Sequence, residues 1–160
     1  MIMQEGVRRM TQQLPLAERM GYVLKQVQQA LRTAMDEALR QHGVTTAQYS
    51  VLRVLEEDSG LSGAALARRC FVAPQTANEM VTHLERLELV ERHRSDDARV
   101  LRTYLTSEGR RLVHACDREV ATIEDRMLRP LSETERQQLV KHLQQCVAAL
   151  DDAHEQRQRA

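Results

Sequence analysis

Residues 90–106, VERHRSDDARVLRTYLT, carry the pattern that decides the fold of this chain. Polar and apolar residues alternate from Val100 through Arg102 to Tyr104, and the preceding run SDDA favours a tight turn. The stretch therefore predicts two β-strands joined as a hairpin, and Thr106 follows as the predicted N-cap of a helix. Since an isolated hairpin is only marginally stable in water, this one is expected to pack against neighbouring elements.

Positively charged side chains gather on this predicted hairpin and just beyond it. Together with one histidine, they are Arg92, His93, Arg94, Arg99, Arg102 and Arg110. Guanidinium groups bind phosphate through paired hydrogen bonds, and a hairpin with almost no core of its own leaves them accessible. The hairpin is therefore expected to contact nucleic acid.

A helix–turn–helix pattern lies directly upstream. A short helix is predicted from Gly63 to about Cys70 with Ser62 as its cap, and a longer amphipathic helix from Pro74 to about Leu87. The second helix of such a motif lies in the major groove and reads base edges from its first turn. A helix–turn–helix followed by a hairpin is a winged helix, so double-stranded DNA is the expected partner.

The exposed residues of that second helix supply the chemistry for reading bases. Those expected in the major groove are Pro74, Gln75, Thr76, Asn78, Glu79 and His83. Gln and Asn can contact adenine through two hydrogen bonds, and Glu can accept one from cytosine N4. A solvated polar face is the alternative for this helix alone, but the adjacent hairpin favours DNA binding.

Four further helices are predicted around this motif. They run from about 16 to 42, from Thr45 or Thr46 to 58, from about 107 to 129, and from a capping box at 132–135 to about 154. The predicted fold is mainly α with a small β-hairpin: about six helices that form a winged helix–turn–helix domain and a helical dimerisation region.

Three of these helices carry apolar stripes at three- and four-residue spacing. The stripes consist of Leu24, Val27 and Leu31; of Val113, Val120, Ile123 and Met127; and of Leu139, Leu143, Val147 and Leu150. A single winged-helix domain cannot cover stripes of this size, so we predict an obligate homodimer.

Composition and charge exclude few functional classes. The formal net charge is zero, whereas many DNA-binding domains are basic, so a winged helix that binds another protein stays open as an alternative. No apolar run approaches the length of a membrane span, and the first residues lack the apolar core of a signal peptide. A soluble cytosolic protein without a membrane partner is expected.

The cysteines argue against a disulfide framework. Cys70, Cys116 and Cys146 are odd in number and contain no Cys-x-x-Cys pair. Buried free thiols are the favoured interpretation, with a cysteine-based redox sensor as the alternative. His142 and Cys146 share a helix face, but two ligands are too few for a metal site. No nucleophile–base arrangement and no glycine-rich phosphate loop is present in the sequence, so neither an enzyme nor a cofactor is expected.

The stretch 61–112 resembles the MarR (multiple antibiotic resistance regulator) family of bacterial transcription regulators. The matching pieces are Leu66-Ala67, Val72 to Val81, Leu84-Glu85-Arg86-Leu87, Leu89-Val90-Glu91-Arg92, Asp97 with Arg99, and Leu105-Thr106 with Gly109. Ala73, Glu79 and Ala98 depart from the residues that are common in the family, and each removes a hydrogen-bond donor or a positive charge.

The resemblance implies a dimer of winged-helix domains on a pseudo-palindromic operator, usually as a repressor released by a small phenolic ligand, an oxidant or a metal. It implies a unit of residues 16–154, with the DNA-binding lobe at about 45–106 and the dimerisation helices at about 16–42 and 107–154. Residues 1–15 would be an N-terminal extension and 155–160 a polar tail. The wing residues would be Arg94, Asp97, Arg99 and Arg102, with Arg99 in the minor groove and Asp97 bracing the wing.

The family's ligands bind in a cleft lined by the first, second and fifth helices. The polar residues expected to face that cleft here are Tyr22, His42, Gln48 and Arg53. One cation on an apolar wall suits a small aromatic carboxylate, which Arg53 could hold by a paired hydrogen bond. The alternative is that Arg53 is a surface residue and that the cleft contains only solvent.

Overall fold

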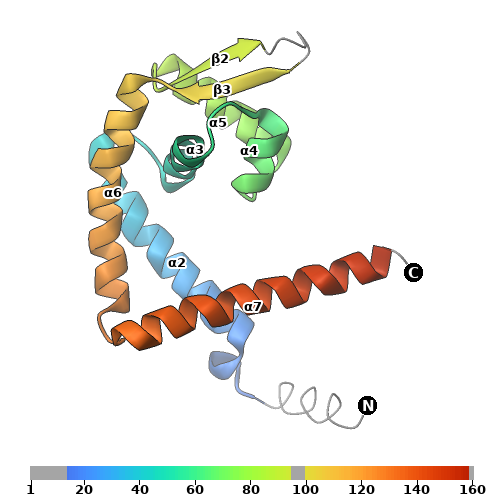
Figure 1. Ribbon diagram of the computed structural model, residues 1–160. Helices are drawn as coiled ribbons and strands as arrows, with labels where there is room; N and C mark the ends of the chain where they lie inside the picture. The colour runs from blue at the N-terminus through green and yellow to red at the C-terminus, as the bar shows by residue number, and fades with distance from the viewer. Residues whose placement is uncertain (1–13, 95–99, 159–160) are drawn as a thin grey trace. The chain divides into compact units, whose positions relative to one another are not determined.

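The computed structural model describes residues 14–94 and 100–158 and divides the chain into two compact units, residues 1–123 and 124–160. The first unit contains the helix–turn–helix and a small antiparallel sheet (Figure 1). The prediction of a mainly helical fold with a winged helix–turn–helix is confirmed.

The first predicted helix consists of three pieces and is interrupted at Arg19, whose backbone is extended (φ −76°, ψ 123°). A short 3₁₀ turn, η1 (Leu16–Glu18), precedes the long helix α2 (Met20–Leu39), and a second 3₁₀ turn, η2 (Arg40–His42), follows it. Gly43 ends the segment with a left-handed φ of 73°, a conformation that glycine adopts without steric cost.

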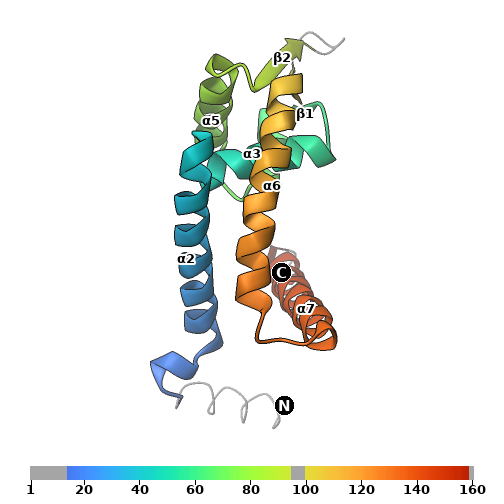
Figure 2. The ribbon, with the colours of Figure 1, turned by 90° about the vertical axis from the view of Figure 1, so that its left-hand side faces the viewer.

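Helix α3 (Thr46–Glu57) begins at the predicted position because Thr45 and Gln48 form a capping box. The Gln48 N–H donates to Thr45 Oγ1 over 3.3 Å, and the Thr45 N–H donates to Gln48 Oε1 over 2.9 Å. Asp36 of α2 accepts from the Thr46 hydroxyl over 2.6 Å and ties the two helices together. In Figure 1, α3 lies between α4 and α6, and the turned view in Figure 2 also shows α3 beside α6.

The helix–turn–helix consists of α4 (Gly63–Arg69) and α5 (Pro74–Arg86). Ser62 caps α4 by accepting from the Ala65 N–H, whereas Ala73 gives α5 no side-chain cap. Pro74 fits the first turn of α5, where its missing N–H leaves no helical hydrogen bond unmade.

The hairpin forms at the predicted position and gains a third strand. Strand β2 (Val90–Arg94) pairs with β3 (Leu101–Leu105) in antiparallel register, with Val90 opposite Leu105. Strand β1 (Leu61–Ser62) pairs with the other edge of β3, so the strand order is β1-β3-β2. A two-residue strand is too short to show a period-2 pattern, so the sequence did not predict it.

The core of the first unit joins all of these elements. Its fully buried side chains include Leu39, Leu52, Leu55, Leu66, Leu84, Val90, Val113 and Cys116. Val113 and Val120 of α6 (Ser107–Leu128) were predicted to lie at a dimer interface, and this prediction is wrong, since both pack in the core of their own chain. Both residues belong to the same buried hydrophobic cluster as Leu39 and Leu55.

In the second unit, residues 124–128 end α6 and α7 spans Glu133–Gln158. The predicted capping box is present: Ser132 Oγ accepts from the Glu135 N–H, and Glu135 Oε2 accepts from the Ser132 N–H over 2.8 Å. The helix extends past residue 154, where the sequence prediction ended it. Its apolar side chains are exposed: Leu139, Val140, Leu143, Val147 and Leu150.

Helices long and apolar enough to cross a bilayer are absent from residues 14–94 and 100–158.

Candidate nucleic-acid interface

Helix α5 separates its residues into a buried face and an exposed face. Ala77, Val81 and Leu84 are buried against the core. All six residues predicted for the major groove are exposed: Pro74, Gln75, Thr76, Asn78, Glu79 and His83. The sequence prediction missed Arg86, which is also exposed at the end of the same helix and adds positive charge there. The helix thus presents a polar surface of the length that enters a major groove.

Two of these exposed side chains are joined to each other. Gln75 Nε2 donates to Glu79 Oε1 over 3.1 Å, one helical turn further on. Such an i,i+4 pair holds both side chains in a defined position on the helix surface. Glu79, which differs from the residue common in the family, therefore has a defined role here: it holds the side chain of Gln75, a residue predicted to contact bases.

Arg92 of β2 connects the hairpin to α5. Its Nε donates to Glu85 Oε2 over 3.0 Å, its Nη1 to Asn78 Oδ1 over 3.4 Å, and its Nη2 lies 3.5 Å from Thr82 Oγ1. The hydrogen bond from Arg92 holds the pKa of the Glu85 carboxyl below its ordinary value. Arg92 was expected among the hairpin charges but not among the site residues, although Glu85, seven residues earlier, is a carboxylate of opposite charge.

The wing residues have different surroundings. Arg94 is exposed at the end of β2, whereas Asp97 and Arg99 lie outside the described residues. Arg102 Nη1 donates to the Gly60 carbonyl over 2.9 Å and so fixes β3 to the segment before β1. The contact uses one of the five N–H donors of the guanidinium group, and Arg102 is exposed, so its assignment to the DNA-binding wing stays a prediction.

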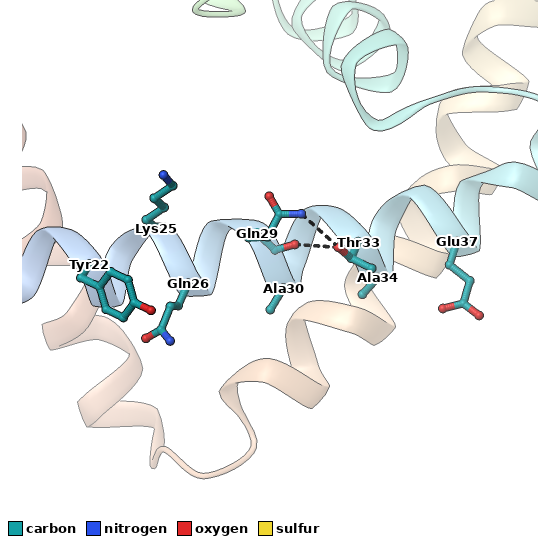
Figure 3. A pocket seen from close by; sticks show the side chains of 8 residues that line it. All are labelled: Tyr22, Lys25, Gln26, Gln29, Ala30, Thr33, Ala34 and Glu37. Carbon is teal, nitrogen blue, oxygen red and sulfur yellow. Dashed lines mark hydrogen bonds between the residues drawn. The ribbon is translucent and has the colours of Figure 1, made fainter. Parts of the chain in front are cut away.

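The four residues predicted for an effector cleft are not brought together. Gln48 is engaged in the α3 capping box, and His42 Nε2 is buried without a hydrogen-bond partner among the residues that the structure describes. Tyr22 lies on α2, where it lines an open groove together with Lys25 and Gln29 (Figure 3). Arg53 belongs to a different cluster, between α3 and α6.

That cluster occupies the whole guanidinium group of Arg53. Nη1 lies 2.8 Å from Glu56 Oε2, Nη2 lies 3.1 Å from Glu57 Oε1, and Nε lies 3.6 Å from Asp117 Oδ1. Asp117 also accepts from the Tyr49 hydroxyl over 2.6 Å. Arg53 already faces three protein carboxylates, which makes it poorly suited to the anchoring role predicted for it.

The cysteines do not share a single environment. Burial, with Asp117 and Glu119 nearby, raises the pKa of the Cys116 thiol to about 11, and burial also raises that of Cys70. Both thiols are therefore weak nucleophiles at neutral pH, which does not favour redox sensing there. Cys146 is exposed on α7, so its interpretation as a buried core thiol is wrong. Within the described parts of the chain, no three His, Cys, Asp or Glu side chains come close enough to hold a metal ion.

Comparison with known proteins identifies the arrangement. Residues 42–99 match the model of the MarR family. A curated relative, the HTH-type transcriptional repressor Rv2887 of Mycobacterium tuberculosis, is 32% identical over 126 residues, which cover 78% of this chain and 91% of the relative.

Solved structures agree with this match. A MarR-family transcriptional regulator from Rhodococcus superposes with a TM-score of 0.76 at 27% identity, covering 81% of this chain and 93% of that one. The M. tuberculosis protein Rv2887 in complex with salicylic acid superposes with a TM-score of 0.66 at 32% identity, covering 79% and 95%. With its exposed helix α5, its adjoining hairpin and these relatives, the chain belongs to the MarR family of transcriptional regulators.

Proposed function

We propose that this protein represses transcription by binding a specific, pseudo-palindromic DNA duplex as a homodimer in the bacterial cytosol. The observation that carries the proposal is the polar face of α5, on which Gln75, Thr76 and Asn78 stand exposed beside a hairpin rich in arginine. Side chains of this kind at the start of a recognition helix can form hydrogen bonds with base edges. No catalytic role is part of the proposal.

Dimerisation is supported by apolar surface that a single chain leaves uncovered. Leu24 and Val27 of α2 are 42% and 46% exposed, and Val147 and Leu150 of α7 are 59% and 73% exposed. Exposed apolar stripes of this extent indicate an interface between protein chains. A second copy of the chain is the proposed occupant, because a two-fold dimer would place two α5 helices on successive turns of one face of a duplex.

The hairpin tip is proposed to supply the non-specific part of the affinity. Arg94 at the end of β2 and Arg99 beyond it would contact phosphate or the narrow minor groove, and Asp97 would orient the turn. Arg102 is assigned a supporting role, since its guanidinium holds the Gly60 carbonyl.

A small aromatic carboxylate or phenol is the proposed effector, as the salicylic acid complex of the relative Rv2887 suggests by analogy. Arg53 is surrounded by Glu56, Glu57 and Asp117, so we propose Lys25, which lines the same α2 groove as Tyr22, as the cation for this ligand (Figure 3). An effector regulates only if it binds the free and DNA-bound states with different affinity. Salicylate is therefore expected to weaken DNA binding by the parent protein and by Arg53→Ala, but not by Lys25→Ala. If salicylate instead weakened DNA binding by Lys25→Ala but not by Arg53→Ala, Arg53 would be the cation that binds the ligand.

The proposed function is tested by selecting binding sites from a pool of random duplexes. The purified protein is expected to enrich an inverted repeat whose half-sites lie about 10 base pairs apart, the spacing that a dimer of such domains imposes. Recovery of a pool without any enriched sequence would overturn sequence-specific DNA binding. Enrichment of a single half-site would overturn the dimer alone.

A further inference from the structure

Two amide side chains on the outer face of α5, Gln75 and Asn78, each form a hydrogen bond with a charged side chain. The partner of Gln75 is negatively charged and the partner of Asn78 is positively charged. An amide group carries a carbonyl that only accepts hydrogen bonds and an NH₂ that only donates them. The partner therefore decides which end of the amide is held by the protein and which end is presented to a ligand.

The partner of Asn78 is Arg92. A guanidinium group has only donors, so the atom of Asn78 that faces Arg92 Nη1 at 3.4 Å has to be the carbonyl oxygen. The NH₂ of Asn78 is then directed away from Arg92. A second donor that approached the same oxygen would come close to the positive charge of Arg92 and be repelled by it. Asn78 and Arg92 together thus form a donor surface.

The guanidinium of Arg92 is itself held in place. Glu85 accepts from Nε over 3.0 Å, Thr82 lies within 3.5 Å of Nη2, and only 21% of the Arg92 side chain is exposed. The donor surface is therefore fixed before DNA arrives, and Arg92 acts through Asn78 as a positioning residue.

The partner of Gln75 is Glu79. A carboxylate only accepts, so the atom of Gln75 that faces Glu79 Oε1 at 3.1 Å has to be the NH₂ nitrogen. The carbonyl of Gln75 is left for a ligand, and a second acceptor near the NH₂ would meet the negative charge of Glu79. Gln75 and Glu79 together thus form an acceptor surface three residues from the donor surface.

Major-groove edges differ in these groups: guanine offers the acceptors O6 and N7, thymine the acceptor O4, cytosine the donor N4, and adenine the donor N6 beside the acceptor N7. We propose that each half-site contains guanine or thymine opposite Asn78–Arg92 and cytosine or adenine opposite Gln75–Glu79. The proposal rests on the proposed function and deepens it. It also replaces the expectation that both amides read adenine through two hydrogen bonds.

The test uses the full-length protein and the duplex that it enriches from a random pool. Asn78→Asp keeps an acceptor for Arg92 but replaces the NH₂ with a carboxylate oxygen. At one position of each half-site, the preferred base should change from guanine or thymine to cytosine or adenine, with roughly tenfold discrimination in each direction. Glu79→Ala releases the Gln75 amide, so the position opposite Gln75 should accept all four bases more evenly.

A second set of variants separates positioning from folding. Arg92→Met should broaden the preference at the Asn78 position to include adenine, because the amide can then turn over. Arg92→Lys keeps a positively charged donor and should restore the parental preference. Arg111→Met, the same type of change at an exposed arginine paired with Glu108 on α6, should leave the preference unaltered. Circular dichroism melting checks that each variant is folded.

Three outcomes would overturn the inference: an unchanged base preference in Asn78→Asp, a parental preference for adenine at the position that Asn78→Asp alters, or failure of Arg92→Lys to restore what Arg92→Met loses. If the parent protein enriches no sequence at all, the proposed function falls and this inference falls with it. An enriched duplex with a wrong base preference overturns only the inference.

Discussion

At the scale of single residues, Gly109 shows how closely the winged-helix lobe and α6 approach each other. A Cβ at this position would lie 2.1 Å from the Leu89 carbonyl oxygen, because the first turn of α6 crosses the end of the α5–β2 connection. Thr106 strengthens the junction: its hydroxyl donates to the Glu88 carbonyl over 2.8 Å and accepts from the Gly109 N–H over 3.0 Å. The Leu89 backbone cannot move away without breaking this cap.

Gly109→Ala is therefore expected to lower the free energy of unfolding by about 1–3 kcal/mol, the usual cost of overpacking. Gly63→Ala is the matched control, since a Cβ there meets nothing within 4 Å and alanine favours the helix. Urea unfolding followed by circular dichroism measures both. Equal stability of the two variants would show that the contact with Leu89 relaxes freely.

Cys116 is expected to make the protein less stable as the pH rises into the alkaline range. Its pKa is raised from 9.0 to about 11, so the unfolded chain loses the thiol proton at a lower pH than the folded chain does. Stability from this group is complete below pH 9 and decreases as the pH rises towards 11, by roughly 1.4 kcal/mol per pH unit for one fully titrating group. Cys116→Ala should reduce the loss between pH 9 and 10 in urea unfolding. An identical slope in both proteins would contradict the shift.

At the scale of elements, α3 is connected to α6 by polar contacts as well as by the core. The Tyr49 hydroxyl donates to Asp117 over 2.6 Å, and burial together with this hydrogen bond raises the pKa of Tyr49. Arg53 lies against the same carboxylate and His114 Nε2 lies 2.8 Å from Glu56 Oε1. These pairs add specific polar contacts to the apolar packing between the two helices.

Tyr49→Phe removes the hydrogen bond and leaves the ring in place. A hydrogen bond to a charged acceptor contributes about 1.5–3 kcal/mol, so the variant should be less stable by about that amount or somewhat less, since Arg53 still faces Asp117. Tyr22→Phe, on the exposed groove of α2, should be neutral. Thermal melts of both variants decide the point, and a parental melting temperature for Tyr49→Phe would deny the contact a role in stability.

The elements were more predictable than the contacts between them. Thr45, Ser62 and Ser132 each indicate the start of a helix, because their side chains can accept a hydrogen bond from a backbone N–H three residues later. All three of these caps are present. The sequence did not show which apolar residues of α6 belong to the core. Their spacing is the same whether a side chain is buried in its own chain, as Val113 is, or contacts a partner chain. The surroundings of Arg53 could not be predicted for a related reason: its partner Asp117 is distant in sequence.

At the scale of the whole molecule, the exposed apolar side chains of α2 and α7 form the surface that the proposed dimer would bury. Leu143→Asp should dissociate the proposed dimer or unfold it, because a carboxylate cannot be buried in an apolar interface without a large cost. Gln145→Asp adds the same charge on the opposite side of α7 and should leave the dimer intact. Sedimentation at micromolar concentration measures both variants, and a parent protein that sediments as a monomer would contradict the dimer.

Recognition of base sequence is assigned to the outer face of α5. Fluorescence anisotropy on the selected duplex and on a shuffled duplex of the same composition, at one salt concentration, measures this recognition. The parent protein should bind the selected duplex at least about a thousandfold more tightly than the shuffled one. Gln75→Ala should lose about 1–3 kcal/mol of binding free energy on the selected duplex and almost nothing on the shuffled one. Equal affinity of the parent for both duplexes, or an equal loss on both in Gln75→Ala, would contradict this assignment.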